Sequence, residues 1–180
     1  MANREALRAF QSRLANRLQT AHTSGVSASW LAVEAGQANY LIPLGHAGEI
    51  FPWTQPQPVP YTQPWFLGVA SLRGGVFGIV ALASFVSSAN ASTSVPAPRD
   101  AGQTQARLVA LNELLEVNCA LQIDRLIGLR GVEAFAASQP PAANASAWMG
   151  HSYTDAAGAQ WQELNLQAMS QHPYFLGIGA

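Results

Sequence analysis

The sequence contains no lysine, and all nine of the basic residues among its 180 are arginines. This excludes chemistry that needs a lysine amine: Schiff bases, pyridoxal phosphate anchoring and the lysine-containing phosphate loop. Cys119 is the only cysteine, which excludes an internal disulfide and a zinc site built on cysteines. A single cysteine suits a reducing compartment, and we predict a cytoplasmic protein.

Charge of either sign is also scarce. Charged residues make up 11% of the chain and hydrophobic residues 49%, a globular composition whose surface must be poor in charge. Such a surface tends to have apolar areas that partners cover. The net charge of −1 provides no overall field toward nucleic acid or anionic lipid, so we expect no nucleic-acid partner.

The N-terminal segment, residues 1–27, is predicted to be a helix followed by a short linker. Apolar residues at steps of three and four indicate an amphipathic helix over residues 3–21, namely Leu7, Phe10, Leu14 and Leu18. Docking on its own domain is the favoured interpretation, and contact with a membrane or a partner is the alternative. The first 25 residues contain four arginines and lack an apolar run, so we expect no secretory signal.

The first β-rich part begins at Trp30. Residues 30–51 alternate like a hairpin, and residues 52–64 contain five prolines, which predicts an extended surface loop. The apolar stretch 65–86 is long enough to span a bilayer, but Arg73 at its centre and the glycines after it oppose insertion. We therefore predict two buried strands with Gly74-Gly75 as their turn and no direct membrane insertion.

The second part follows a small, polar segment at 87–106, which is predicted to be a flexible connector. Strands are predicted over 107–112 and 118–131, then a loop-rich stretch over 133–148 and a hairpin over 149–166. Asn165 is placed to cap a short C-terminal helix with Leu166 and Met169 facing inward. Two β-rich blocks with short strands indicate two small barrels.

The sequence offers little that could perform catalysis. The four histidines are scattered without metal-ligand spacing, and no nucleophile motif or dinucleotide fingerprint is present. Cys119 is interpreted as a small buried hydrophobe rather than a reactive thiol. Asp124 and Arg125 are interpreted as a polar pair at a strand end, and burial of one of the two is the alternative. We therefore expect no enzyme, no cofactor and no metal.

A binding function fits better, because one loop is rich in residue types favoured at protein interfaces. Tyr61 and the prolines around it lead into Trp65 and Phe66. The plainer alternative is that these two aromatic residues only begin a core strand. We expect one of them to face inward and the other to lie at the surface.

Residues 58–85, "PVPYTQPWFLGVASLRGGVFGIVALASF", resemble the signature of CheW-like domains: a proline-rich stretch, Gly-Val-x-Asn-Leu-Arg-Gly and an apolar strand. Residues 40–51, 119–129 and 162–169 agree with the family in order and spacing, so the resemblance covers about 28–178. In this alignment Gly68, Leu72, Arg73 and Gly74 match motif positions, and Asp124 matches the later "Val-Asp" strand. Ser71 and Ala81 depart from it, replacing the usual asparagine and aspartate.

The resemblance implies a fold and a function. The fold is mainly β, with two side-by-side SH3-like barrels of five strands, and the protein is a non-catalytic adaptor. It would join the signalling tip of a methyl-accepting chemoreceptor to the regulatory domain of a CheA-type histidine kinase. Partner binding would fall to Arg73, with Trp65, Phe66 and Tyr61 as further candidates. "TQPWFLGVA" and "HPYFLGI" further resemble the PilI-type adaptors of type IV pilus twitching systems.

Two alternatives stay open beside the adaptor. One is a stand-alone CheW-like domain that regulates, or binds a small ligand, outside a receptor array; Ala81 and the alanine-rich segment 133–148 support it. The other is an enzyme or membrane-anchored protein using 65–86. We expect a cytoplasmic protein associated with membrane receptor arrays.

Overall fold

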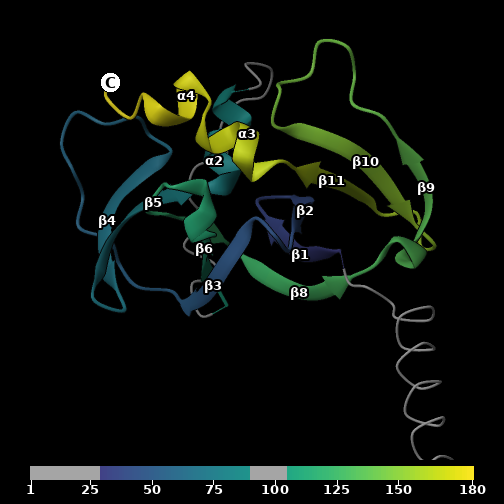
Figure 1. The fold of residues 1–180 in the computed structure, drawn as a ribbon, viewed down its shortest axis with the longest axis horizontal. Coiled ribbons are helices and arrows are strands. Elements are labelled where there is room, and N and C mark those ends of the chain that lie inside the picture. The colour runs from purple at the N-terminus through teal and green to yellow at the C-terminus, as the bar shows by residue number, and fades with distance from the viewer. Residues whose placement is uncertain (1–28, 90–104) are drawn as a thin grey trace, which may run out of the picture.

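The computed structural model describes residues 29–89 and 105–180, which form two curled β-sheets with short helices packed beside them (Figure 1). The predicted helix at 3–21 lies outside the described residues, as does most of the predicted connector at 87–106. No helix of the described residues is long and apolar enough to cross a bilayer.

The elements follow one another as short strands with a few helical turns. The first half contains β1 (Trp30–Ala35), β2 (Ala38–Pro43), β3 (Ala47–Pro52), β4 (Phe66–Leu72), β5 (Gly75–Ala81) and α2 (Leu82–Ala89). The second half contains β6 (Arg107–Leu111), η1 (Glu113–Leu115), β7 (Cys119–Ile123), β8 (Arg125–Arg130), η2 (Val132–Ala134), β9 (Phe135–Gln139), β10 (Met149–Asp155), β11 (Gln160–Leu164), α3 (Leu166–Ser170) and α4 (Pro173–Leu176).

The two sheets contain five and six strands. The five-stranded sheet has the order β3-β6-β7-β5-β4, and the six-stranded sheet has the order β8-β1-β2-β11-β10-β9. Most neighbours are antiparallel, but β5 pairs with β7 and β2 pairs with β11 in parallel. The mainly β prediction is confirmed, whereas the expectation of five strands in each barrel is wrong for the second sheet.

Neither sheet is built from one block of sequence, which corrects the expectation that each predicted block forms its own barrel. The five-stranded sheet joins β3, β4 and β5 with β6 and β7, which follow residues 90–104 in the chain. The six-stranded sheet joins β1 and β2 with β8 to β11. Each sheet thus contains strands from both predicted blocks, an arrangement that we call the exchange of strands. Hydrophobic periodicity identifies strands but does not show which strands pair, so the sequence could not predict this exchange.

Three local predictions also need correction. The predicted strand at 76–85 ends at Ala81, and the rest of that stretch is the helix α2. Its buried residues Leu82, Phe85 and Val86 lie at helical spacing, a pattern that a short apolar run does not separate from a strand. Residues 118–131 are two strands that belong to different sheets, and the predicted loop at 133–148 contains β9.

Other local predictions are confirmed. The stretch 30–51 contains the β1–β2 hairpin, and 149–166 contains the β10–β11 hairpin. Asn165 caps α3 by accepting a hydrogen bond from the Ala168 backbone N–H at 3.1 Å. Both Leu166 and Met169 are fully buried, as expected.

The hydrophobic core has three parts. A small cluster lies in each sheet, around Ile79 and Leu108 in the five-stranded sheet and around Leu41 and Trp161 in the six-stranded sheet. The largest cluster combines residues of both sheets with residues of α2, α3 and α4. Since apolar burial is the main stabilising contribution to folding, this shared cluster binds the two sheets into one unit.

Candidate partner-binding surfaces

Arg73 and Gly74 form the turn between β4 and β5. Their φ angles of 47° and 82° are both positive, as the two central residues of a type I′ hairpin turn require. Gly75 already pairs with Leu72, so the turn lies one residue earlier than the predicted Gly74-Gly75. The requirement for positive φ explains Gly74, whereas Arg73 adopts this conformation despite its side chain.

Arg73 forms an ion pair with Glu49 of β3. The Nη2 atom of Arg73 lies 2.7 Å from Oε1 of Glu49, and the two side chains are 76% and 39% exposed. Because β3 and β4 are the outer strands of the five-stranded sheet, this pair connects the two edges of the same curled sheet. We name the exposed region of Glu49, Arg73 and Val76 the edge surface; Val76 is 64% exposed.

The proline-rich loop is fixed to β4 at Gln57. Its backbone N–H donates to the Val69 carbonyl at 2.7 Å, and the Val69 N–H donates back to the Gln57 carbonyl at 2.9 Å. Gly68, with φ of +127°, lies directly below this contact, and a Cβ atom there would collide with the Gln57 carbonyl oxygen. The predicted structural role of Gly68 thus has a specific cause, the close approach of a second backbone.

The C-terminal residues 177–180 hold the same loop from its other side. Gln63 N–H donates to the Ile178 carbonyl at 2.8 Å, and Ala180 N–H donates to the Tyr61 carbonyl at 3.0 Å. The Gln63 side-chain amide donates to the Gly179 carbonyl at 3.0 Å. The sequence does not indicate this pairing, because the glycine-rich residues 177–180 have no strand pattern.

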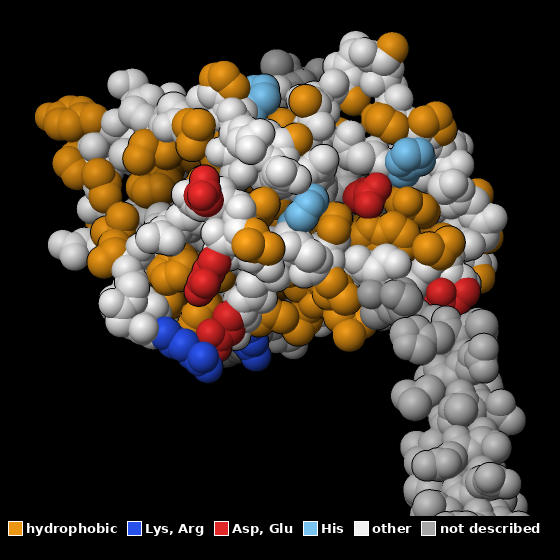
Figure 2. Space-filling view, viewed as in Figure 1, with side chains coloured by type: hydrophobic (Ala, Val, Ile, Leu, Met, Phe, Trp, Pro, Cys, Tyr) orange, Lys and Arg blue, Asp and Glu red, His pale blue; other side chains and the backbone are white. Residues whose placement is uncertain are grey.

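Together the loop and the tail expose an apolar patch that we name the tail–loop surface. Its large hydrophobic residues are Val59, Tyr61, Leu176 and Ile178, and Tyr61 is 89% exposed. The stretches 50–72 and 164–180, which supply these residues, contain no aspartate, glutamate or arginine. Figure 2 shows hydrophobic side chains gathered on the side of the molecule where Figure 1 places this loop and the C-terminus.

Trp65 is completely buried, so it offers no surface to a partner and belongs to the core instead. Its ring stacks on Phe175 at 6.2 Å and meets the edge of Phe85 at 5.2 Å. Phe66 is partly buried, and its ring covers Gly78 of β5. One of the two aromatic residues therefore faces inward, as expected, and the other is only partly accessible.

Asp124 and Arg125 both stabilise the β1–β2 hairpin. Asp124 Oδ2 accepts a hydrogen bond from the Gly36 N–H at 2.6 Å, and Arg125 lies 2.6 Å from a carboxylate oxygen of Glu34. Both residues are exposed, so the idea that one is buried is wrong. Their contacts link the β7–β8 junction to the first hairpin and give both a structural role.

Leu72 and Cys119 are both buried in the core. Leu72 packs in the cluster of the five-stranded sheet, next to the exposed turn that holds Arg73. Burial raises the pKa of the Cys119 thiol to about 12, so at neutral pH it is a protonated, apolar group. Across 29–89 and 105–180, no three histidine, cysteine or acidic residues are grouped to hold a metal ion.

Comparison with known proteins agrees with this geometry. The model of one family, described as the CheW-like domain, matches residues 29–173. The chain belongs to the CheW-like domain family. Among solved structures, this CheW-like chain is similar to the scaffolding protein TtCheW from Thermoanaerobacter tengcongensis, with a TM-score of 0.56 and 11% identity. The similarity covers 75% of this chain and 86% of that one, and no curated protein matches.

The family assignment confirms the expected CheW-like domain, its mainly β fold and the expectation of a non-catalytic domain. It does not assign roles to individual surface residues, which are inferred from their contacts and exposure. Glu49 was not among the predicted site residues. Glu49 lies on β3 and meets the Arg73 turn only because the five-stranded sheet curls and brings its two outer strands together. The order of residues along the chain does not indicate this contact.

Proposed function

We propose that this CheW-like protein couples a methyl-accepting chemoreceptor to a CheA-type histidine kinase by binding both at once. The observation that supports it is the presence of two separate exposed surfaces, one near each end of β4. The tail–loop surface adjoins the start of β4, and the edge surface lies at its end. A strand of seven residues is roughly 23 Å long, which leaves room for two partners.

The tail–loop surface suits the receptor tip. A receptor signalling tip is helical, and amphipathic helices bind through an apolar face with anchors at helical spacing. The tail–loop surface is apolar and without charged side chains, and Tyr61 is a residue type favoured at interface centres. Phe66, at the start of β4, is partly buried and keeps part of its surface accessible.

The edge surface suits the kinase regulatory domain. Arg73 donates to Glu49 with one part of its guanidinium, and its exposed remainder can still contact a partner. Val76 adds an exposed apolar contact beside the pair. A mixed patch of this kind gives orientation through charge and affinity through apolar burial.

We further propose that the system is the one that controls type IV pilus twitching motility. The two segments that resemble the pilus-linked branch are far apart in sequence, but their aromatic residues meet in the core. Trp65 stacks on Phe175 and also packs near Tyr174, with ring centroids 5.7 Å apart. Because the two segments that resemble the pilus-linked branch contact each other, one structural requirement would explain both resemblances. This supports the assignment to that branch.

Binding measurements with single-site variants test the proposal. Purified protein is titrated with a receptor signalling-tip fragment and with the kinase regulatory domain. Tyr61→Ser should weaken receptor binding at least about tenfold and leave kinase binding unchanged, and Arg73→Glu should do the reverse. Leu129→Ser, at an exposed leucine of β8 in the other sheet, is the matched control and should affect neither.

The combination of Arg73→Glu with Glu49→Arg separates two roles of Arg73. If only the ion pair matters, the swapped pair restores kinase binding; if the guanidinium contacts the kinase, binding stays weak. Absence of binding to both fragments overturns the proposed function and favours a CheW-like domain that acts outside a receptor array.

A further inference from the structure

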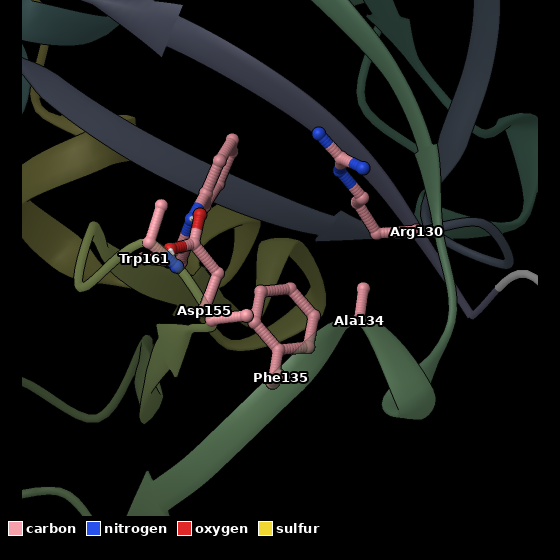
Figure 3. A pocket seen from close by; sticks show the side chains of 7 residues that line it. Arg130, Ala134, Phe135, Asp155 and Trp161 are labelled. Atoms are coloured by element: carbon pink, nitrogen blue, oxygen red, sulfur yellow. Dashed lines mark hydrogen bonds between the residues drawn. The ribbon is translucent and has the colours of Figure 1, made fainter.

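A cavity of about 240 Å³ opens in the six-stranded sheet, which contributes to neither of the two surfaces above. It lies between the end of β8, η2, the start of β9 and the β10–β11 hairpin. Figure 3 shows Arg130 across the cavity from Asp155 and Trp161, with Phe135 and Ala134 at its lower side.

The inner side of this cavity is aromatic. Phe135 lies 5.1 Å from Tyr153 and 6.3 Å from Trp161 between ring centroids, and Trp30 joins the group at 5.0 Å from Tyr153. Trp161 and Trp30 are buried, and Phe135 and Tyr153 are partly buried. Phe135 and Trp161 line the cavity, and the other two rings support them from behind. Apolar and aromatic linings are typical of sites that hold a side chain or a small molecule.

Arg130 supplies a positive charge that no ion pair of the described residues takes up, although at longer range it also helps to lower the pKa of Asp155. Its guanidinium carbon lies 5.9 Å from the centroid of the Trp161 ring, and no hydrogen bond or ion pair joins it to any residue of 29–89 or 105–180. The other described arginines differ: Arg73 and Arg125 pair with glutamates, and Arg107 donates to the Ala106 carbonyl. Arg130 therefore keeps its donors for a ligand.

Asp155 sets the orientation of that ligand. Its carboxylate accepts hydrogen bonds from Trp161 Nε1 at 3.0 Å and from the N–H groups of Ala157 and Ala159 at 2.9 Å each. The Trp161 bond is the main reason why the pKa of Asp155 is lowered, so this group stays ionised. A ligand carboxylate is repelled from this wall and attracted to Arg130 opposite.

We propose that the cavity binds a peptide segment of a partner protein in which an acidic residue is flanked by apolar ones. The carboxylate would take the Arg130 donors in a bidentate contact, and an apolar neighbour would cover Phe135 and Trp161. A volume of about 240 Å³ is smaller than most small-molecule sites and close to that of one large side chain. The proposal does not depend on the receptor–kinase function, because the cavity lies in the other sheet.

Nuclear magnetic resonance of the five tryptophan indole N–H groups tests this, with the Trp161 signal assigned from Trp161→Phe. The probes are the capped peptides acetyl-Gly-Leu-Glu-Leu-Gly-amide and its Gln counterpart, with N-acetyl-leucine as a free small carboxylate. The Glu peptide should shift the Trp161 signal saturably, since that N–H lies in the cavity wall. The Gln peptide should bind at least about tenfold more weakly.

Variants complete the test. Arg130→Gln should weaken binding of the Glu peptide at least about tenfold. Arg130→Lys should weaken it less, because lysine keeps the charge but not the bidentate geometry. Arg125→Gln, on the same strand but paired with Glu34, should leave binding unchanged. The other indole signals check that each variant is folded. Equal binding of the two peptides, or of Arg130→Gln and the parent, overturns the proposal, and tight binding of N-acetyl-leucine overturns the choice of a peptide.

Discussion

At the scale of single residues, two glycines in the β4–β5 hairpin have positive φ for different reasons. Gly74 belongs to a turn that is open on its outer side, and nothing lies within 4 Å of a Cβ atom placed there. Gly68 instead faces the backbone of Gln57 at a distance that leaves no room for a methyl group. The same residue type thus serves a conformation at one position and a close contact at the other.

This difference predicts unequal effects of one substitution. Gly74→Ala should lower the free energy of unfolding by about 1–2 kcal/mol, the cost of a left-handed conformation. Gly68→Ala should lower it by about 3 kcal/mol or more, because the proline-rich loop must also move away. Urea unfolding of the two variants beside the parent measures this, and equal losses would contradict the proposed contact with Gln57.

The sequence predicted both glycines through the family motif, together with the turn to within one residue. It did not predict the ionic partner of Arg73 or the contact that Gly68 makes. Glu49 and Gln57 approach the hairpin only because the sheet curls and the loop folds back onto β4. Such contacts depend on long-range geometry, which the spacing of residues along one strand does not encode.

At the scale of elements, the departure at Ala81 gains a different meaning from the structure. Ala81 ends β5 and directly precedes α2, where a residue capping the helix would be expected. It is 8% exposed, so a carboxylate there depends on the hydrogen bonds that a cap would make. The motif of CheW-like domains has an aspartate at this position. An aspartate there could accept hydrogen bonds from the first free N–H groups of the helix. Alanine cannot do this, and α2 also has no acidic residue in its first turn.

Ala81→Asp should therefore raise the free energy of unfolding by about 1 kcal/mol. Ala81→Glu adds the same charge on a longer side chain that caps poorly, so it is the matched control and should gain less. Thermal and urea unfolding of both variants measure the effect. If Ala81→Asp is less stable than the parent, or the two variants gain equally, α2 does not depend on a cap at this position.

At the scale of the whole molecule, the shared core makes the two sheets interdependent. Cys119 is on β7, inside the five-stranded sheet, and its side chain belongs to the cluster that also contains Leu31 and Ile42 of the six-stranded sheet. Cys119 is 4% exposed, so we expect a reagent to reach its thiol only when the sheets separate.

Labelling of Cys119 by a thiol reagent should therefore follow global unfolding. At mildly alkaline pH the folded protein should react very slowly, because the pKa of about 12 keeps the thiol protonated and burial excludes the reagent. The rate should rise with urea in parallel with loss of circular dichroism, and protein in denaturing guanidinium supplies the fully reactive reference. Fast labelling of the native protein would show that the sheets open locally.

The sequence predicted most strands of this core but not their assembly. Strands lie within the predicted segments 30–51, 65–86, 107–112 and 118–131, since alternation and β-branched residues are local properties. The division of the strands between sheets was wrong because β8 and β7, adjacent in sequence, join different sheets. The cavity at Arg130 collects residues from both sides of η2 and from the β10–β11 hairpin, a grouping that the spacing of residues along the chain does not indicate.

The exchange of strands also has a consequence for synthesis on the ribosome. The Trp30 indole N–H donates to Glu163 at 2.8 Å, and these residues are 133 positions apart. At 5–20 residues per second the first hairpin waits roughly 7–27 s before the strand that completes its sheet is made. During that interval the edge of β2 that later pairs with β11 stays open, while the five-stranded sheet can already assemble. A nascent chain of this protein therefore exposes an unpaired strand for most of its synthesis, the period when chaperone protection matters most.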